Sequence, residues 1–235
     1  GKLGMEEDQP IEHKWVTKAI ESSQKKVEAH NFDIRKHLLE YDDVNNLQRS
    51  EIYSFRREIL AADSLEDRIS EMREKLLDDV LSIHCPEDKH PEEWDLKSLK
   101  DALYGQFAIY PEIELSNFEE LRSKLLGEVT HAYKKKEQEI GAETFRYLER
   151  MIMLQVLDTQ WKDHLLSMDH LKEGVGLRGY GQRDPLIEYK KEAFEIFANL
   201  SDRVASEVVA RLTKIQIARE DTVEKKFAPR PSRMI

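Results

Sequence analysis

The part of this chain that most resembles a ligand-binding motif is a glycine-rich stretch, residues 174–185, with the sequence GVGLRGYGQRDP. Three of its glycines form a G-x-G-x-x-G pattern: Gly174, Gly176 and Gly179. In dinucleotide-binding folds such glycines follow a strand and open a helix, so that backbone N–H groups reach a pyrophosphate. Here the pattern follows a long amphipathic helical segment, and no strand–helix–strand unit is predicted around it. We therefore interpret these glycines, with Gly181 and Pro185, as a hairpin turn in which glycine supplies positive φ angles.

Other motifs of catalysis and metal binding are missing from the sequence. It contains no G-x-x-x-x-G-K-[ST], no G-x-S-x-G and no H-E-x-x-H. His84, Cys85 and His90 surround a proline-containing loop, but without a paired C-x-x-C or H-x-x-x-H their spacing is poor for zinc. His164 and His170 are six residues apart and fall on different faces of a helix. We therefore expect no catalytic residue and no metal site. A nucleotide-binding enzyme that uses the glycines is the alternative, and it predicts measurable dinucleotide affinity.

The tip of the expected hairpin combines an aromatic residue with basic ones. Tyr180 stands between two glycines, and beside it lie Arg178, Gln182 and Arg183. Residues 171–191 contain five basic and three acidic side chains, in a chain whose net charge is −10. A tyrosine at a protruding turn offers a ring for apolar surface and a hydroxyl for water or backbone, which suits a contact group. The alternative, a tyrosine folded back on its own helices, stays open at this point.

The composition predicts that helices position these residues. Hydrophobic residues make up 40% and charged residues 36% of the 235, as in long helices with one apolar stripe and a wide charged face. Nine glycines and seven prolines are too few for an all-β fold. The charge of −10 disfavours nucleic-acid binding through a broad basic face. One cysteine excludes a disulfide framework, and no segment resembles a membrane span or a signal peptide, so we expect a soluble cytosolic chain.

One very long helix is expected near the start of the chain. No glycine or proline occurs from Ile11 to Cys85, and Trp15–Leu60 is predicted as one helix of about 70 Å. Its apolar residues recur at spacings of three and four: Ile34, Leu38, Tyr41, Val44 and Leu47, then Ile52, Phe55 and Ile59. The irregular step between Leu47 and Ile52 indicates that the stripe changes face there. Asp42 and Asp43 are expected on a solvated acidic face unless a partner supplies Arg or Lys.

A side lobe is expected over residues 61–140. Asp63 and Ser64 resemble a capping signal for a second helix that ends near Ser82. A less regular stretch with three prolines follows, with a short helix near Asp95–Leu103. Ser116 followed by Glu119 predicts a capping box that opens a helix towards Gly141.

Two further helices are expected to form an antiparallel hairpin around the glycine-rich turn. Their apolar stripes are Leu154, Leu157, Trp161, Leu165 and Met168, and then Phe194, Phe197, Leu200, Val204, Val208, Leu212 and Ile215. A tight reversal at the glycines makes the two stripes face each other. Beyond about Arg219 no stripe continues, so residues 220–235 are expected to be a tail or linker.

Two blocks of sequence resemble the SecA preprotein translocase motor family. They are KWVTKAIESSQKKVEAHNFDIRKHLLEYDDV (14–44) and LDTQWKDHLLSMDHLKEGVGLRGYGQRDPLIEYKKEAFEIF (157–197). The resemblance implies an all-α fold with four parts: a lead-in and long scaffold helix (1–60), a helical wing (61–140), a two-helix finger (141–219) and a flexible tail (220–235).

The resemblance also implies roles for residues. The scaffold helix would pack on both nucleotide-binding lobes, with Arg35, Leu38, Tyr41 and Asp42 at the interface. The finger would be held together by Trp161, Leu165, Met168, Phe194 and Phe197, and would enter the mouth of the SecYEG channel. Tyr180 matches the fingertip tyrosine that touches the translocating polypeptide, and the finger region would restrain the ATPase until preprotein arrives.

The family's ATP site, preprotein cross-linking domain and Cys-rich zinc segment have no counterpart in this sequence. We therefore expect a C-terminal portion with no cofactor of its own, whereas the full-length family binds ATP with Mg²⁺ and a zinc ion. The implied partners are preprotein, SecYEG, the chain's own missing domains and, through the full-length protein, an anionic membrane surface. The implied location is the cytoplasmic face of the cell membrane. A free-standing coiled-coil adaptor is the alternative, and it predicts a stable, long dimer.

Overall fold

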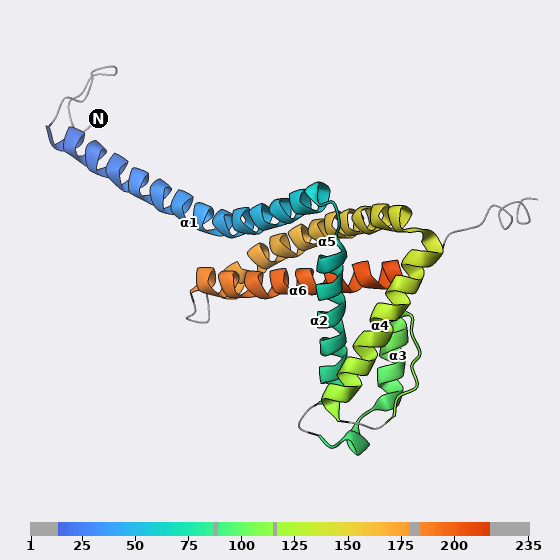
Figure 1. The fold of residues 1–235 in the computed structure, drawn as a ribbon. Coiled ribbons are helices and arrows are strands. Elements are labelled where there is room, and N and C mark those ends of the chain that lie inside the picture. Colours follow the sequence, from blue (N-terminus) through green and yellow to red (C-terminus); the bar gives the residue numbers. More distant parts are fainter. Residues whose placement is uncertain (1–13, 87–88, 115–116, 179–183, 217–235) are drawn as a thin grey trace, which may run out of the picture. The chain divides into compact units, whose positions relative to one another are not determined.

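The computed structural model describes residues 14–86, 89–114, 117–178 and 184–216. These residues form α-helices and one short 3-10 helix, and no strand occurs among them (Figure 1). The elements are α1 (Lys14–Ala61), α2 (Glu66–His84), η1 (Pro91–Glu93), α3 (Leu96–Phe107), α4 (Phe118–Ile140), α5 (Ala142–Arg178) and α6 (Pro185–Lys214). The predicted all-α class is confirmed. Among the described residues, no helix has a stretch long and apolar enough to cross a membrane.

The chain divides into two compact units. The first unit combines residues 1–50 with 168–193, and the second combines residues 51–167 with 194–235. Helices α1, α5 and α6 each contribute residues to both units. The predicted four-part division into scaffold, wing, finger and tail stays a prediction, because compactness alone does not test it. The predicted tail, residues 220–235, lies outside the described residues.

In the first unit, α1 begins as a helix with no buried side chain. All residues from Thr17 to Leu39 are exposed, and the exposed fractions of Trp15 and Phe32 are 80% and 61%. The predicted stripe is therefore uncovered here, since Ile34, Leu38 and Leu47 are all exposed. Buried side chains of this unit come from the end of its α1 segment and from α5 and α6: Gln48, Met168, Leu171, Val175, Tyr189 and Ala193.

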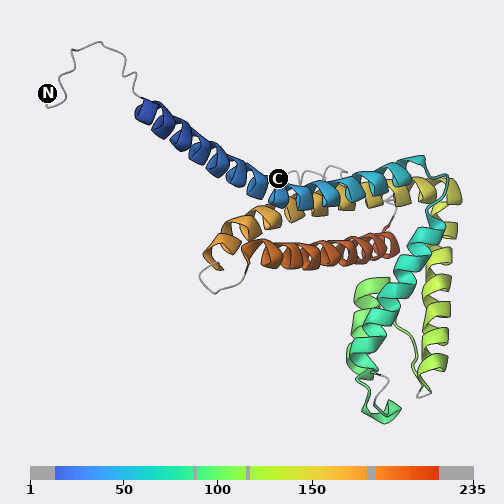
Figure 2. The same cartoon turned by 90° about the vertical axis from the view of Figure 1, so that its left-hand side faces the viewer.

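The second unit contains two hydrophobic clusters. The first lies between the end of α1, the start of α2, and parts of α4, α5 and α6, with Ile59, Ile69, Phe145, Met153 and Leu212 among its buried members. The second lies between α2, α3 and α4, with two residues of α6. Figure 2 shows α2, α3 and α4 side by side. Because these helices enclose most of this second core, the irregular sequence over the described residues 89–114 still belongs to a packed lobe.

Helix starts in the second unit are set by short polar side chains. Asp95 caps α3 by accepting a hydrogen bond from the Ser98 N–H at 3.0 Å, and Asn117 caps α4 by accepting from the Glu120 N–H at 2.9 Å. The predicted cap at Ser116 is therefore wrong by one residue. Before α2, the Ser64 hydroxyl accepts from the Glu66 N–H at 3.2 Å, although the residue at the cap position is Leu65.

Helix α5, the first helix of the hairpin, ends later in the sequence than the glycine pattern predicted. Gly174 and Gly176 lie within α5, which continues to Arg178, so their assignment to the turn is wrong. A Cβ at Gly174 would meet nothing within 4 Å, which means that packing does not demand glycine there. A helix tolerates single glycines at a cost of about 1 kcal/mol each. Pro185 is the first residue of α6, where its missing N–H costs no hydrogen bond.

Candidate functional site

The predicted fingertip falls mostly outside the described residues. Gly179, Tyr180, Gly181, Gln182 and Arg183 are not described, and of Arg178 only its place at the end of α5 is. The contact role of these residues therefore stays a prediction. What the structure describes is how the rest of the hairpin is held.

In the first unit, Tyr189 of α6 is the centre of the contact between the hairpin and α1. Its side chain is fully buried, and its ring meets that of Tyr41 edge to face, with 4.8 Å between centroids and 64° between planes. Its hydroxyl donates to Asn45 Oδ1 at 3.4 Å. Burial raises the pKa of Tyr189 despite the opposing effect of the Asn45 hydrogen bond, which keeps the hydroxyl a neutral donor.

Two polar contacts flank this ring pair. Gln48 is buried, and its Nε2 donates to the carbonyl oxygen of Ala193 at 3.0 Å. Lys172 of α5 and Asp42 of α1 form an ion pair at 3.1 Å with both side chains partly exposed. Asp42, Asn45 and Gln48 are spaced three apart and therefore share one face of α1. We call Tyr41, Asp42, Asn45 and Gln48, with Lys172, Tyr189 and Ala193, the hairpin seat.

In the second unit, the two hairpin helices are joined by aromatic packing. His164 is fully buried, stacks on Trp161 at 5.2 Å between centroids and meets the edge of Phe197 at 5.6 Å. Burial and, to a lesser extent, the charge of Arg203 lower the pKa of His164 to about 4. The imidazole is therefore neutral at ordinary pH, which suits a ring that serves packing rather than proton transfer.

These features can be compared with those of known proteins. Residues 10–216 match the family model described as the SecA Wing and Scaffold domain. The chain belongs to this family. It is 53% identical over 224 residues to the protein translocase subunit SecA of Thermodesulfovibrio yellowstonii, covering 94% of this chain and 25% of that protein. The subunit of Syntrophus aciditrophicus is 46% identical over 227 residues, covering 95% of this chain and 27% of that protein. The chain thus spans about a quarter of the length of these relatives.

The interface residues that the SecA resemblance implied for α1 separate into two pairs. Tyr41 and Asp42 belong to the hairpin seat. Arg35 and Leu38 are exposed, and Leu38 retains half of its accessible surface. Asn45 and Gln48 were not predicted as site residues. Gln48 lies in the break of the apolar stripe between Leu47 and Ile52, which is the signal that could have found it, whereas no break in the stripe marks Asn45.

The residues predicted to pack the hairpin together also divide into two groups, those that are buried or partly buried and one that is exposed. Trp161 and Met168 are buried, and Leu165 and Phe197 are partly buried against the core. Phe194 is 72% exposed, so its assignment to the packing face is wrong. In the part of α6 on either side of Phe194, the buried positions are spaced by four, seven and four residues: Tyr189, Ala193, Leu200 and Val204. Phe194 follows Ala193 directly and is turned about 100° away from that face.

Proposed function

We propose that this chain is the wing and scaffold portion of a SecA-type protein translocase, in which it couples ATPase lobes to the movement of preprotein through SecYEG. The observation that carries the proposal is the hairpin seat, because it fastens the hairpin to a helix that continues far beyond it. A displacement of α1 would be passed to Tyr189 and Ala193 through a ring pair in which Tyr189 is fully buried and through a buried hydrogen bond. Family membership supports the same role.

The uncovered part of α1 supports the expected partners within the intact protein. Trp15, Ile20, Val27, Phe32 and Leu39 are each more than half exposed. Large apolar side chains grouped on a surface mark sites of interaction. We propose that nucleotide-binding and preprotein cross-linking domains cover them, and that ATP with Mg²⁺ binds in those domains and not in this chain. A zinc ion in a further tail segment belongs to the same proposal.

The turn of the hairpin is proposed as the part that meets preprotein or the channel. Tyr180, with Arg178, Gln182 and Arg183, supplies a ring and positive charge at a turn between two helices. On this proposal the working protein acts at the cytoplasmic face of the cell membrane, bound there through SecYEG and anionic lipid. Restraint of the ATPase in the absence of preprotein would then depend on the hairpin remaining on its seat.

The proposal is tested in the intact translocase with Gln48→Ala and Tyr189→Phe combined. Loosening the seat should raise ATP hydrolysis without preprotein and lower translocation per ATP. Glu195→Gln, an exposed change on α6, is the matched control and should alter neither rate. Unchanged coupling in a folded seat variant would contradict the proposed role. Tyr180→Ala separately tests the turn, since full-rate translocation by a folded variant would remove its contact role.

A coiled-coil adaptor is a second candidate, and the exposed stripe of α1 is the observation that favours it. Two copies could cover these residues by pairing along α1. Sedimentation of the purified chain distinguishes the two functions. A stable dimer whose formation protects residues 14–39 from hydrogen exchange would favour the adaptor, whereas non-specific association would favour a surface meant for missing domains.

A further inference from the structure

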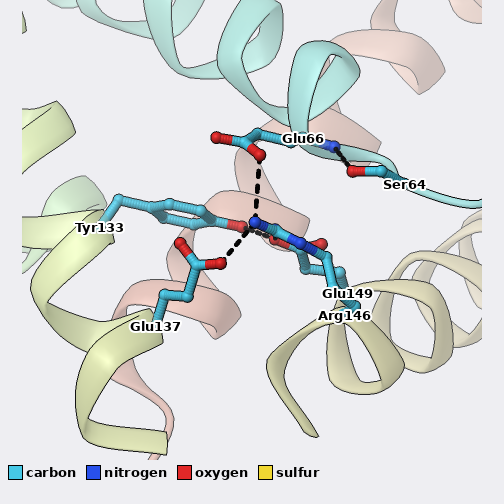
Figure 3. A network of polar contacts seen from close by, with 6 residues as sticks. All are labelled: Ser64, Glu66, Tyr133, Glu137, Arg146 and Glu149. Carbon is cyan, nitrogen blue, oxygen red and sulfur yellow. Dashed lines mark hydrogen bonds and ion pairs between the residues drawn. The ribbon is translucent and has the colours of Figure 1, made fainter. Parts of the chain in front are cut away.

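The second unit contains a group of buried charges where α2, α4 and α5 meet. The chain passes this place twice, once in the turn between α1 and α2 and once at Gly141 between α4 and α5. We call the group the root cluster: Glu66 and Arg73 of α2, Tyr133 and Glu137 of α4, and Arg146 and Glu149 of α5. In Figure 3, labelled side chains from all three helices are directed towards one another.

Glu149 is the centre of the root cluster. Glu149 has no exposed surface, and its Oε1 accepts hydrogen bonds from the Tyr133 hydroxyl and from Arg146 Nη1, both at 2.6 Å. Tyr133 is itself 3% exposed. Burial, and then the charge and hydrogen bond of Glu149, raise the pKa of Tyr133, so the hydroxyl stays a donor. One carboxylate oxygen therefore joins α4 to α5 away from water.

Arg146 extends the connection to a third helix. Its Nη2 donates to Glu137 Oε1 at 2.5 Å and to Glu66 Oε2 at 3.1 Å. Burial acts to lower the pKa of Arg146, but the hydrogen bond to Glu149 and the nearby carboxylates outweigh it, so the pKa is raised. A planar guanidinium suits this branching because its donors point in several fixed directions.

Arg73 closes the cluster from the side of α2. It is 4% exposed, and its guanidinium carbon lies 4.0 Å from the centre of the Tyr133 ring. The edge contact between Tyr133 and Phe145, at 5.1 Å, supports the same ring. Arg73 Nε and Nη1 and Glu149 Oε2 are buried without a hydrogen-bond partner among the described residues. The charges therefore depend on one another, since other partners are few.

A second link between α2 and α4 offers a contrast. Arg122 donates to Asp78 at 2.6 Å and to Glu74 at 2.8 Å, but these carboxylates retain 43% and 49% of their side-chain exposure. Water can replace such bonds when the helices separate, whereas it reaches Glu149 and Arg73 only if the helices open. Opening at the root cluster is therefore strongly opposed.

We propose that the root cluster is a clamp that fixes the base of the lobe formed by α2, α3 and α4 to the start of α5, so that these parts move as one body. Because the part of α5 from Ala142 to Ser167 belongs to the same unit as the lobe, a force on the lobe would act directly on this part of the helix. The clamp rests on the fold of the second unit and not on the proposed translocase function.

Hydrogen exchange on the purified chain tests the clamp. Tyr133→Phe removes the hydroxyl but keeps the ring, and Glu149→Gln removes the charge but keeps the shape. Either change should speed amide exchange in residues 66–73 and 142–150 by roughly tenfold, with α3 unchanged. Arg122→Gln is the matched control, because it breaks a partly exposed link between two of the same helices, and should change exchange by less than about twofold.

The pattern of exchange decides the outcome. Equal acceleration in α3 would mean general loss of stability, and unchanged exchange at 66–73 and 142–150 would mean that the cluster holds nothing; either result overturns the clamp. The double variant should speed exchange by less than the product of the two single effects, because both changes act on the Tyr133–Glu149 hydrogen bond. Independent, multiplied effects would also overturn it. Arg146→Lys gives a milder test if a variant fails to fold.

Discussion

The hairpin seat and the root cluster both join helices through polar side chains, but they differ in the burial of their charged groups. The seat uses a ring pair, a buried hydrogen bond of 3.0 Å from Gln48 to Ala193, a hydrogen bond of 3.4 Å and an ion pair whose partners are partly exposed. The root cluster uses hydrogen bonds of 2.6 Å to a carboxylate with no exposed surface. The ion pair of the seat, which water reaches, opens at low cost, whereas the bonds to the buried carboxylate of the root cluster do not.

This difference suggests a division of labour within the chain. Elements that move in allosteric proteins are drawn from the less stable parts of a fold. The charged residues of the seat, Asp42 and Lys172, keep contact with water, so the seat suits a joint that releases more readily than the root cluster does. The root cluster suits a joint that stays closed. Four substitutions or conditions, taken from the largest expected effect to the smallest, would break or sharpen this contrast.

Glu149→Ala should have the largest effect. It leaves Arg146 and Arg73 with buried charge and without the central carboxylate, which should cost about 3–5 kcal/mol of unfolding free energy. Urea unfolding followed by circular dichroism measures the loss. Arg122→Gln should cost less than about 1 kcal/mol, as expected for an exposed pair. Similar losses for the two variants would remove the contrast between buried and exposed links.

Tyr189→Ala should come next, with a loss of about 3 kcal/mol from an emptied buried site. The loss should be local, because Tyr189 packs within the first unit. Hydrogen exchange should accelerate in residues 168–178 and 185–193 while α3 stays protected. Ile187→Ala, a change of an exposed apolar residue on the same helix, is the control. If α3 loses protection as well, the two units do not unfold separately.

The sequence could predict the helices better than their contacts. Trp15–Leu60 was predicted as one helix and α1 spans Lys14–Ala61, because uninterrupted periodicity without glycine or proline leaves few alternatives. Gly174 and Gly176 were misplaced because a glycine in a turn and a glycine in an exposed helix leave the same mark in a sequence. Phe194 was misplaced because a neighbouring small residue, Ala193, takes the buried position.

The buried polar residues were missed for a related reason. Gln48, Arg73 and Glu149 occupy positions where the spacing of the core calls for an apolar residue. Sequence patterns treat such residues as interruptions, whereas their partners lie on other helices and are found only in three dimensions. A polar residue at a core spacing is therefore a signal worth testing in relatives of this chain.

Acidification should have the third-largest effect of the four. The pKa of His164 is 6.5 in an unfolded chain and about 4 in the fold, so the unfolded state binds the proton more readily between these values. Stability should be fully present above pH 6.5 and should fall as the pH drops towards 4, by up to about 3 kcal/mol. Comparing the pH dependence of urea unfolding with that of His164→Phe isolates this contribution. Identical slopes would show that the pKa of His164 does not differ between the folded and unfolded states.

Lys172→Gln should have the smallest effect and sharpens the contrast from the other side. It removes the ion pair to Asp42 at the hairpin seat, where both partners are partly exposed. The loss should be about 0.5 kcal/mol or less and should shrink as salt is raised, because mobile ions screen an exposed pair. Asp42→Asn should give the same small loss, and the double variant should add nothing further.

Hydrogen exchange at residues 168–175 in 50 mM and 500 mM salt, about a tenfold range of ionic strength, measures this loss and its salt dependence. A large, salt-independent loss would place the Lys172–Asp42 pair with the buried charges of the root cluster, and the hairpin seat would then be a fixed joint as well.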